Sequence, residues 1–390
     1  MADTHTYDII IFGGGVAGLW LGCRLQRAGY NILLVEKDRL GCGQTLASQG
    51  MIHGGQKYAL SFKGLGHTDI AASCPARWEE CFEGFGDIDL SAVKFSGESQ
   101  FMWPAGGVLS RLALALSALA VRGRAERMKA EHYPEVLKEN KKFSGPVYEL
   151  HEKVLDVKSL VSAMAAQLKG RIVKGEMSDI LPDGQVAVSG KVLKADVVIC
   201  AGGSGNEDVL RRLGVSGEEK IFQRRPLRQV MVKTLPHALH GHAVTTKSKP
   251  RMTVTSHPVA GGHVWYLGGS VAEAGAHMTE EQTLRFAKEE LKAVFPHIDW
   301  GGREWASLAI DRAEPCDATG QLPPGPHVHQ RGRVLVTWPV KLTMAPLLGD
   351  KIFVWLQDGG IQPGKKTAAP DLPVPETGLY PWEAATWQKL

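Results

Sequence analysis

Apolar and polar positions over the first part of the chain predict a strand, a helix and a second strand. Residues 7–12 are mostly apolar, as in a buried strand, residues 19–28 follow a helical period that stops at Gly29, and residues 31–36 contain a second apolar run that ends at Glu36. The two strands of such a unit lie parallel and are joined by a right-handed crossover. The glycine-rich turn at residues 13–18 should therefore lie at the carboxyl end of the first strand.

The pattern of helical and strand-like segments continues to residue 356. Residues 64–142 look mostly helical and include the apolar run 112–121, which is too short to span a bilayer and favours a packed helix. The later helical segments are 159–168, 280–294 and 344–356. The later strand-like segments are 171–173, a hairpin at 184–190, a buried strand ending in a glycine turn at 195–205, alternating segments within 223–308, and 332–340.

These elements predict an α/β fold, α+β overall, in which a Rossmann-like nucleotide-binding domain is interleaved with a substrate domain built on a mostly antiparallel sheet. A chain of 390 residues is longer than a usual single core, which agrees with two interleaved domains. The predicted divisions are 1–85 for the first part of the nucleotide-binding domain, 86–150 for a mainly helical insertion of the substrate domain, 151–222 for the second part of the nucleotide-binding domain, 223–310 for the substrate-domain sheet, 311–356 for the C-terminal part of the nucleotide-binding domain, and 357–390 for a Pro-rich tail.

The composition changes in this tail, where prolines replace aliphatic residues. We expect the tail to be extended or partly disordered. Tyr380, Trp382 and Trp387 could pin it to the body of the protein or to a partner, and a loose terminus is the competing interpretation.

Composition narrows the class of protein. Hydrophobic residues make up 44% and charged residues 22% of the chain, which are ordinary values for a globular protein. A net charge of +4 is too small to indicate nucleic-acid binding. The 6 cysteines form no CxxC pair and no zinc-ligand spacing, and the N-terminus has no basic region followed by a cleavage site. We therefore expect reduced thiols, a cytoplasmic location and no integral membrane segment.

The turn after the first strand reads Gly13-Gly14-Gly15-Val16-Ala17-Gly18, a G-x-G-x-x-G sequence. The first glycine permits a tight turn, the second lets backbone N–H groups approach a pyrophosphate, and the third lets the helix lie close to the strand. An acidic residue, Glu36, ends the second strand, where a carboxylate can accept the ribose hydroxyls. The candidate cofactor contacts in this unit are Gly13, Gly15, Val16, Ala17, Gly18, Glu36 and Lys37.

A second glycine-rich loop favours one dinucleotide over the others. A carboxylate at Glu36 repels a 2′-phosphate, which argues against NADP and leaves FAD and NAD. An enzyme that binds only NAD has no need for another long glycine-rich loop directly after Glu36, whereas the ribityl chain and ring of FAD extend beyond the pyrophosphate. Residues 43–58, GQTLASQGMIHGGQKY, form such a loop, so FAD is the predicted cofactor.

Several segments up to about residue 356 resemble the D-amino-acid-oxidase-like superfamily of FAD-dependent oxidoreductases, which includes glycine oxidase, FAD-dependent glycerol-3-phosphate dehydrogenase and L-2-hydroxyglutarate dehydrogenase. The resembling segments are the glycine turn with Glu36, TLASQGMIHGG, GEMSDI, ADVVICAGGSG and WPVKLTMAPLLGDKI. The last segment is similar to the G-K-[WL]-T-T form of the glycerol-3-phosphate dehydrogenases, with Val340 in place of the Gly before Lys341.

The resemblance implies a role for residues in each segment. Thr45 and Ser48 would bind the phosphates or the ribityl chain, and the backbone of Gly50, Met51 and Ile52 would line the flavin edge near N5. Met177 would meet the adenine, and Ala201 and Gly202 the ADP half. Lys341, Leu342 and Thr343 would lie where reduced flavin develops negative charge at N1 and the C2 carbonyl, which a helix start and a Lys can stabilise.

The same resemblance implies hydride transfer from a C–H bond that bears an amine or a hydroxyl to flavin N5. His53 is the first candidate for a base, because an imidazole titrates in the working range, and a purely structural role in the loop is the alternative. Arg312 is the candidate for a substrate carboxylate, although its spacing departs from the family pattern. Arg251 and His257 could line the pocket, and solvated strand positions are the plainer interpretation.

Two departures from the family limit the substrate and the mode of attachment. Lys57 stands where the glycerol-3-phosphate dehydrogenases tend to have an Arg, so it keeps the charge and loses the two-pronged geometry. Cys316 lies near the place where some relatives attach FAD covalently, but its surroundings in the sequence differ, so we predict non-covalent FAD.

The leading hypothesis is an FAD-dependent oxidase or dehydrogenase acting on a small 2-hydroxy acid, amino acid or secondary amine. The alternatives are a polyol-phosphate dehydrogenase of the glycerol-3-phosphate type and an FAD protein acting on a larger carrier-bound or RNA-bound substrate. An NAD-only dehydrogenase would be colourless after purification. The electron acceptor is open between oxygen and quinone, and a homo-oligomer is open as well.

Overall fold

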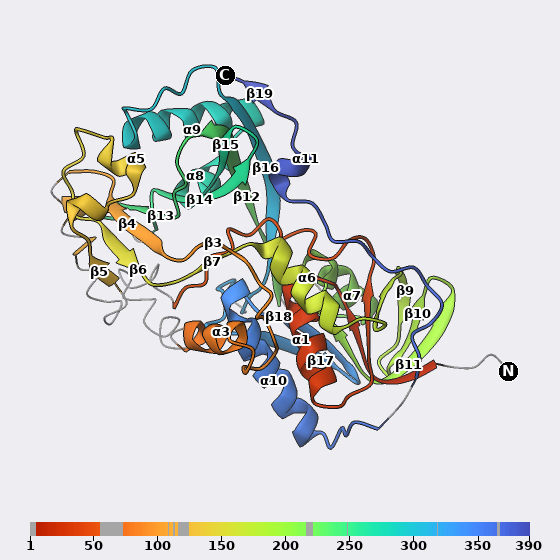
Figure 1. Cartoon of the computed structure of the whole chain (residues 1–390). Coiled ribbons are helices and arrows are strands. Elements are labelled where there is room, and N and C mark those ends of the chain that lie inside the picture. The colour runs from red at the N-terminus through yellow and green to blue at the C-terminus, as the bar shows by residue number, and fades with distance from the viewer. Residues whose placement is uncertain are drawn as a thin grey trace.

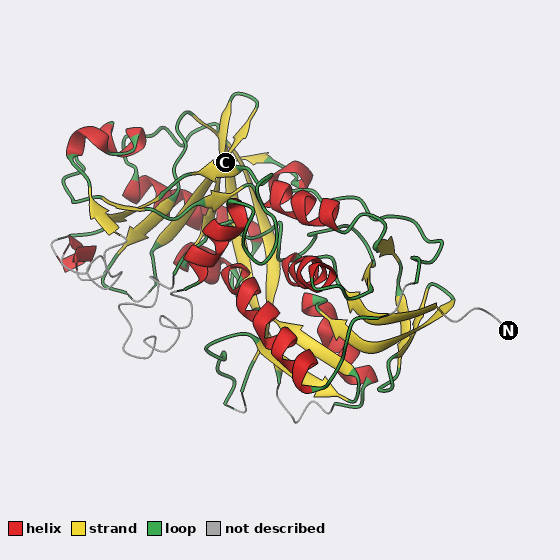
Figure 2. Ribbon diagram, turned by 60° about the horizontal axis from the view of Figure 1, so that its bottom comes forward, coloured by secondary structure: helices red, strands yellow, loops and turns green. Residues whose placement is uncertain are grey.

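The computed structural model describes residues 5–54, 73–107, 109–111, 114–115, 125–215, 221–247, 249–317, 319–364 and 367–390. Two large sheets occupy the two halves of the molecule, and the long strands β12 (Phe222–Leu235) and β16 (Glu304–Pro315) run between them (Figure 1, Figure 2). The N-terminus lies at the end of the first sheet and the C-terminus at the end of the second (Figure 1).

The first sheet is built around three parallel strands. Strand β1 (His5–Phe12) pairs in parallel with β2 (Ile32–Glu36) on one side and with β11 (Lys191–Cys200) on the other. Its order is β17-β18-β11-β1-β2-β8, and β10 and β9 attach to β11 as an antiparallel hairpin. The remaining bounds are β8 (Ile172–Lys174), β9 (Met177–Ile180), β10 (Gln185–Val188), β17 (His327–Arg331) and β18 (Val334–Trp338).

Helices bury one face of this sheet. Helices α1 (Val16–Arg27), α6 (Val157–Gln167) and α10 (Ala345–Asp358) pack together over it, with α3 (Cys74–Phe82) beside α10. The strand residues are apolar on both faces because α7 (Asn206–Arg212) and the β9–β10 hairpin contribute to a second core on the opposite side. The carboxyl ends of β1, β2 and β11 therefore meet at one edge of a fully covered sheet.

The second sheet has 9 strands in the order β19-β16-β12-β15-β14-β13-β4-β6-β5. Its neighbours are antiparallel except for β13 and β4, which are parallel. The remaining bounds are β4 (Gln100–Pro104), β5 (Ala125–Arg127), β6 (Tyr148–Leu150), β13 (Gly241–Val244), β14 (Met252–Val259), β15 (Gly262–Gly268) and β19 (Gln388–Lys389). A separate pair is formed by β3 (Phe95–Gly97) and β7 (Val154–Leu155).

The two faces of the second sheet have different neighbours. On one face, α8 (Ser270–Gly275) and α9 (Glu280–Val294) cover a core that includes Trp265, Phe295 and Trp305. From the opposite face, Met231 and Tyr266 join the core of the first half of the molecule. The short elements are η3 (Ala130–His132), α5 (Glu135–Lys138), η4 (Gly203–Gly205), η6 (Leu342–Met344) and α11 (Pro381–Ala384).

The mixed α/β architecture with one parallel-centred and one mostly antiparallel sheet confirms the predicted fold class. The prediction that 86–150 is mainly helical is wrong for the described residues, because β3, β4, β5 and β6 lie there and three of them extend the second sheet. Sequence periodicity failed because these strands are only 3 to 5 residues long. The apolar run 112–121 lies largely outside the described residues.

Two further expectations need correction. Strand β16 continues to Pro315, so Arg312 belongs to the second sheet and not to the C-terminal part of the nucleotide-binding domain. The described tail is extended, and Tyr380 and Trp382 are buried against the body, so the tail is attached to this chain and is not a loose terminus.

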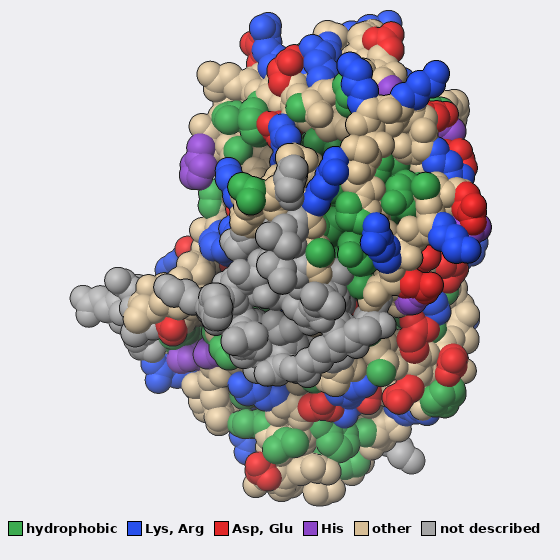
Figure 3. All heavy atoms as spheres, turned by 90° about the vertical axis from the view of Figure 1, so that its left-hand side faces the viewer, with side chains coloured by type: hydrophobic (Ala, Val, Ile, Leu, Met, Phe, Trp, Pro, Cys, Tyr) green, Lys and Arg blue, Asp and Glu red, His purple; other side chains and the backbone are tan. Residues whose placement is uncertain are grey.

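On the face seen in Figure 3, the Lys and Arg side chains of the described residues are interspersed with Asp and Glu. Within the described ranges, the helices are too short or too polar to cross a membrane.

Candidate cofactor site and active site

The turn between β1 and α1 requires glycine at two positions. Gly13 has a φ of +107°, and a Cβ atom there would lie 2.6 Å from the carbonyl oxygen of Ala201. A Cβ atom on Gly18 would lie 1.9 Å from the carbonyl oxygen of Gly13. These close approaches let α1 begin directly behind the end of β1, so the first and third glycines have the roles that the sequence predicted.

The N-terminus of α1 has few neighbours among the described residues. Its N-cap residue, Gly15, makes no side-chain cap, and no acidic residue lies in the first turn. Among the residues that the structure describes, a Cβ on Gly15 would meet Oγ1 of Thr45 at 3.1 Å, and that hydroxyl oxygen accepts a hydrogen bond of 3.0 Å from the N–H of Val16. The first turn of α1 therefore contains no carboxylate, and its positive dipole end can receive an anion at Gly15.

Glu36 lies beside this turn at the end of β2. Its carboxylate is buried, with Oε2 accepting a hydrogen bond of 2.6 Å from the N–H of Gly14 and Oε1 accepting one of 2.8 Å from the N–H of Asp38. Lys37 is exposed next to it. The acidic residue is thus at the carboxyl edge of the sheet, as the βαβ pattern predicted.

The turn after β11 completes this edge. The N–H of Ala201 donates to the carbonyl oxygen of Phe12 at 2.8 Å, which brings Ala201 and Gly202 next to Gly13. Met177 begins β9, two positions after Gly175, whose N–H donates to the carbonyl oxygen of Glu36 at 2.9 Å. The structure therefore brings all the residues predicted for the ADP half to one end of the first sheet.

The second glycine-rich loop is fixed along β7. The carbonyl oxygen of Gly50 accepts a hydrogen bond of 2.9 Å from the N–H of Leu155, and the N–H of Ile52 donates to the carbonyl oxygen of Lys153 at 3.1 Å. Between them Met51 forms an isolated bridge with Val154. The loop thus pairs with β7 over these residues.

The same loop is also held by the second sheet. The amide of Gln49 donates to the carbonyl oxygens of Thr253 and Tyr266 at 3.2 and 3.1 Å. The hydroxyl of Tyr266 donates to the carbonyl oxygen of Ala47 at 2.9 Å and lies 2.6 Å from Oε1 of Gln229. Burial raises the pKa of Tyr266, so it stays a neutral donor.

His53 is buried at the end of this loop, with 9% of its surface exposed. The next residue, Gly54, donates its N–H to Oε1 of the buried Glu152 at 3.0 Å, and the fully buried Gln100 donates its amide to the carbonyl oxygen of Ile52 at 3.1 Å. Gln100 lies in the span 64–142 that sequence analysis expected to be mostly helical, and Glu152 lies in no segment that was assigned to a helix or a strand, so no sequence signal linked either residue to His53. Lys57, which was compared with an Arg of relatives, lies outside the described residues.

Another buried polar pair lies close to Gln49 on the second sheet. Nδ1 of His242 is 3.0 Å from the hydroxyl oxygen of Thr253, and both side chains are buried. Sequence analysis did not select either residue. Because Gln49 binds the carbonyl oxygen of Thr253, this pair is a candidate for the wall that faces the loop.

The segment after β18 turns sharply before α10. Val340 has a φ of +69°, a left-handed conformation that a β-branched residue rarely adopts. Lys341 then precedes η6, where the carbonyl oxygen of Thr343 accepts a hydrogen bond of 2.9 Å from the indole N–H of Trp78. Leu342 is partly buried against the main core, and Thr343 is fully enclosed. Burial raises the pKa of the Cys74 thiol to about 11, with Arg77 and Lys341 acting in the opposite direction.

Arg312 lies among carboxylates. Its Nη2 is 3.4 Å from Oε1 of Glu273, and its Nε is 3.9 Å from Oε1 of Glu314. Glu314 is also paired with both nitrogens of the Arg225 fork. A substrate carboxylate at Arg312 would therefore compete with two resident acidic groups.

The two strand residues proposed as pocket or surface positions have other roles. Arg251 forms a two-pronged ion pair with Glu290 at 2.6 and 3.0 Å. His257 is buried and stacks on Trp382, so the interpretation of a solvated strand position is wrong for it. The six cysteines are free, and Cys316 is buried at the end of β16, where its N–H donates to the carbonyl oxygen of Ile221.

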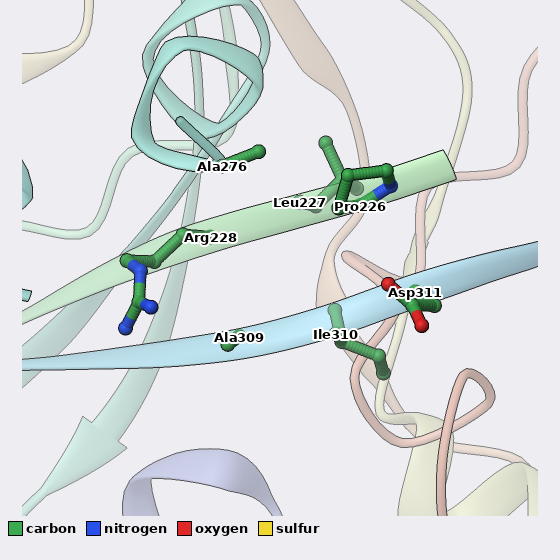
Figure 4. A pocket seen from close by; sticks show the side chains of 7 residues that line it. All are labelled: Pro226, Leu227, Arg228, Ala276, Ala309, Ile310 and Asp311. Carbon is green, nitrogen blue, oxygen red and sulfur yellow. The ribbon is translucent and has the colours of Figure 1, made fainter. Parts of the chain in front are cut away.

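A hollow of about 250 Å³ lies at the surface of the β12–β16 ladder (Figure 4). It is lined by Pro226, Leu227, Arg228, Ala276, Ala309, Ile310 and Asp311. The side chains of Arg228 and Asp311 point away from each other in this hollow (Figure 4). It is a surface feature next to Arg312 and contains none of the predicted site residues.

Comparison with known proteins shows the family to which the chain belongs. The family model for FAD dependent oxidoreductases, DAO, matches residues 8–352. A Pseudomonas aeruginosa protein, named as a probable FAD-dependent oxidoreductase, is 40% identical over 392 residues, which cover 99% of this chain and 100% of the relative. The chain therefore belongs to the DAO family of FAD-dependent oxidoreductases.

Solved structures show the same fold. The crystal structure of the Pseudomonas aeruginosa protein has a TM-score of 0.84 at 36% identity and covers 98% of this chain and 99% of that one. Glycine oxidase from Geobacillus kaustophilus has a TM-score of 0.64 at 18% identity, covering 95% of this chain and 99% of that one. L-alpha-glycerophosphate oxidase from Mycoplasma pneumoniae, solved with FAD bound, has a TM-score of 0.66 at 15% identity, covering 97% and 100%.

The protein is thus an FAD-dependent oxidoreductase, and the residues present fit that cofactor. The uncapped start of α1 has space for a pyrophosphate above Gly15, and the Glu36 carboxylate lies where ribose hydroxyls are bound in this type of fold. The loop of residues 43–54 continues from this edge toward the second sheet, which provides the length that FAD has beyond its ADP half.

Proposed function

We propose that the protein oxidises a C–H bond carrying a hydroxyl or an amine on a small substrate, such as a 2-hydroxy acid, an amino acid or a secondary amine. The observation that carries this proposal is the burial of His53 at the end of a loop that β7 and the second sheet hold, beside Gln100 and Glu152. A buried imidazole between a nucleotide-binding edge and a polar sheet face suits proton transfer in a small enclosed site.

The cofactor contacts follow from the same arrangement. The residues that we propose to hold FAD are Gly13, Gly15, Val16, Ala17, Gly18, Glu36, Lys37, Thr45, Ser48, Gly50, Met51, Ile52, Met177, Ala201, Gly202, Lys341, Leu342 and Thr343. When bound, FAD supplies a hydride acceptor at N5. We propose that FAD is held non-covalently. Cys316, the cysteine compared with the attachment site of some relatives, is buried, and its backbone N–H donates to the carbonyl oxygen of Ile221.

His53 is proposed to take the proton of a substrate hydroxyl on an imidazole nitrogen, or to accept a hydrogen bond from a substrate amine. Glu152 accepts a hydrogen bond from the backbone N–H of Gly54, the residue after His53. This contact fixes the backbone from which the His53 side chain extends. Lys341 is proposed to provide positive charge at the opposite end of the site, where its position before η6 adds to the N–H groups of the helix start.

Arg312 remains our candidate for the residue that binds a substrate carboxylate. The substrate would have to displace the carboxylate of Glu273 from it. Free cysteines throughout support a reducing, cytoplasmic-type compartment. Oxygen and quinone are both compatible acceptors, and the proposal requires neither a nucleic acid nor a second copy of the chain.

The test is a visible absorption spectrum of the purified protein, recorded anaerobically during additions of 2-hydroxy acids, amino acids, secondary amines and glycerol phosphate. Bleaching by one of the first three classes supports the proposal, and bleaching by glycerol phosphate alone would assign the polyol-phosphate alternative. A flavin spectrum unchanged by every addition would contradict the proposal and direct attention to a carrier-bound or RNA-bound substrate.

A variant pair makes the test specific for His53. With the substrate that bleaches the flavin, His53→Asn should slow anaerobic reduction about 100-fold or more, which is the usual contribution of a positioned acid or base. His132→Asn changes an exposed histidine with 67% side-chain exposure and should reduce at the wild-type rate. Equal rates in the two variants would leave His53 without the proposed role.

A further inference from the structure

The C-terminal tail, residues 359–390, lies beyond the family match, which ends at residue 352. It runs from α10 along the edge of the first sheet and ends at the second sheet (Figure 1). The hydroxyl of Tyr7 donates to the carbonyl oxygen of Ala368 at 2.7 Å, and the N–H of Lys174 donates to the carbonyl oxygen of Pro373 at 2.6 Å. The tail is therefore fixed to the nucleotide-binding half before it reaches the cofactor loop.

The tail next pairs with the segment that joins Glu36 to the second glycine-rich loop. The N–H of Leu40 donates to the carbonyl oxygen of Glu376 at 2.8 Å, and the N–H of Gly378 donates back to the carbonyl oxygen of Leu40 at 2.9 Å. The adjacent residue, Gly41, donates its N–H to the carbonyl oxygen of Gly14 at 2.8 Å. Two adjacent residues, Leu40 and Gly41, thus connect the tail to the glycine turn.

Gly378 lies directly against the loop. A Cβ atom at this position would lie 2.9 Å from Cδ1 of Leu46, 3.2 Å from the carbonyl oxygen of Leu40 and 3.4 Å from the backbone nitrogen of Cys42. The tail backbone can approach this closely only because the residue has no side chain.

Beyond Gly378 the tail enters the gap between α6 and the second sheet. The ring of Trp382 stacks on His257 with centroids 4.0 Å apart and meets the ring of Tyr266 edge-on at 5.6 Å. The hydroxyl of Tyr380 donates to Oδ1 of Asp156 at 2.7 Å. Trp382 is 7% exposed, and it supports the tyrosine whose hydroxyl holds the carbonyl oxygen of Ala47.

We propose that the C-terminal tail is a third part of the FAD site, in which Gly378 and Trp382 are positioning residues that keep residues 40–54 in the conformation that receives the cofactor. The inference rests on the proposed role of that loop. A glycine-rich loop loses much conformational freedom when it binds a ligand, and contacts that order it beforehand reduce this cost. The tail contacts it at Leu40 and Leu46 directly, and at Ala47 through Tyr266.

The test is the rate at which the purified holoenzyme releases FAD on dilution, followed by the rise of free-flavin fluorescence. Trp382→Ala should release FAD at least about 10-fold faster than wild type, because the support of Tyr266 is lost. The matched control is Trp387→Ala in the same tail, whose ring packs under Nζ of Lys233 at 4.0 Å on the far strand β12. This control should change the release rate less than about 2-fold.

Two smaller changes keep the inference testable if Trp382→Ala fails to fold. Tyr266→Phe removes the hydroxyl that lies against the carbonyl oxygen of Ala47 and Oε1 of Gln229, and it should speed release about 3- to 10-fold, because a phenol has a single hydrogen to donate. Gly378→Ala adds a methyl group against Leu46 and should act in the same direction. The unfolding midpoint of each variant after FAD removal, measured by far-UV circular dichroism, separates a positioning role from a general loss of stability.

Faster FAD release with an unchanged midpoint of the FAD-free protein supports the inference. A lowered midpoint with wild-type release rates would overturn it and make the tail a purely structural element. If the wild-type protein neither retains nor takes up FAD, the proposed function fails, and the inference that rests on it fails too.

Discussion

The hydroxyl oxygen of Thr45 accepts a hydrogen bond from the backbone N–H of Val16 at 3.0 Å. This contact joins the second glycine-rich loop to the first turn of α1, where the pyrophosphate of FAD should bind. The two loops that the sequence identified separately therefore form one surface. Each of the following predictions concerns a contact that shapes this surface or supports it.

Thr45→Val removes the hydroxyl and keeps the branched shape. We expect FAD affinity to fall about 3- to 10-fold, because one hydrogen bond of about 0.5–1.5 kcal/mol near the phosphates is lost. Thr45→Ser keeps the hydroxyl and should bind within about 2-fold of wild type. Fluorescence titration of the FAD-free proteins measures both, and equal affinities in the Val and Ser variants would remove Thr45 from the site.

Substitution of two glycines of the turn should affect two different properties, the stability of the protein and its affinity for FAD. Gly18→Ala forces a methyl group to within 1.9 Å of the carbonyl oxygen of Gly13, so we expect it to lower the free energy of unfolding. Overpacking of this kind costs about 1–3 kcal/mol or more. Gly15→Ala meets only Thr45 and should leave the unfolding free energy of the FAD-free protein within about 0.5 kcal/mol of wild type.

The cost of Gly15→Ala should instead appear in binding, because its methyl group occupies space that the pyrophosphate needs. We expect at least about a 10-fold loss of FAD affinity, equivalent to about 1.4 kcal/mol. Denaturant unfolding and FAD titration of both variants give the comparison. A Gly15→Ala variant that binds FAD normally would mean that the cofactor phosphates lie elsewhere.

Local patterns in the sequence were sufficient for the parts of the fold with regular periodicity. The glycine turn, Glu36 and helix α9 at Glu280–Val294 were all predicted, because each depends on neighbours within a few residues. Strands β4 and β6 were missed because their pairing partners lie far away in the chain and each strand is too short to have a clear period.

The same reasoning explains what was missed in the candidate site. Gln100 and Glu152 gain their significance only from contacts with the backbone at Ile52 and Gly54, which folding brings together. The tail was expected to be extended or partly disordered because its prolines carry no periodic signal. In the structure, Trp382 packs against the rings of His257 on β14 and Tyr266 on β15. Long-range contacts of this kind have no signature in a single sequence.

Val340 is strained in its turn. Its φ of +69° costs a β-branched residue about 1–3 kcal/mol. We expect Val340→Gly to raise the free energy of unfolding by about 1 kcal/mol, after the loss of its partial packing and the greater freedom of Gly in the unfolded chain. Urea denaturation of the wild-type and variant proteins measures this change. A Val340→Gly variant that is less stable than the wild-type protein would contradict the prediction.

Acid should destabilise the protein through two buried histidines. Burial lowers the pKa of His257 to about 3 and that of His240 to about 4, and His263 adds to the effect on both. Their unfolded pKa is about 6.5, so below that pH the unfolded chain binds protons that the folded chain does not. Stability is therefore complete above pH 6.5 and falls by about 1.4 kcal/mol per pH unit for each histidine as the pH drops toward 4.

A variant isolates the contribution of His257. His257→Phe retains a ring against Trp382 and cannot titrate, so the slope of unfolding free energy between pH 4.5 and 6.5 should fall by about 1.4 kcal/mol per pH unit. His132→Phe changes an exposed histidine and should leave the slope as in wild type. Identical slopes in the two variants would show that His257 is not the group responsible.

The most direct measurement is a crystal structure of the protein with FAD bound. We expect the pyrophosphate over Gly15 at the start of α1, the ribose hydroxyls at Glu36, and the flavin ring between the Gly50–Ile52 backbone and Leu342, with His53 beside it. Density for FAD at the β12–β16 hollow, or with its ring turned away from His53, would contradict both the proposed site and the reaction built on it.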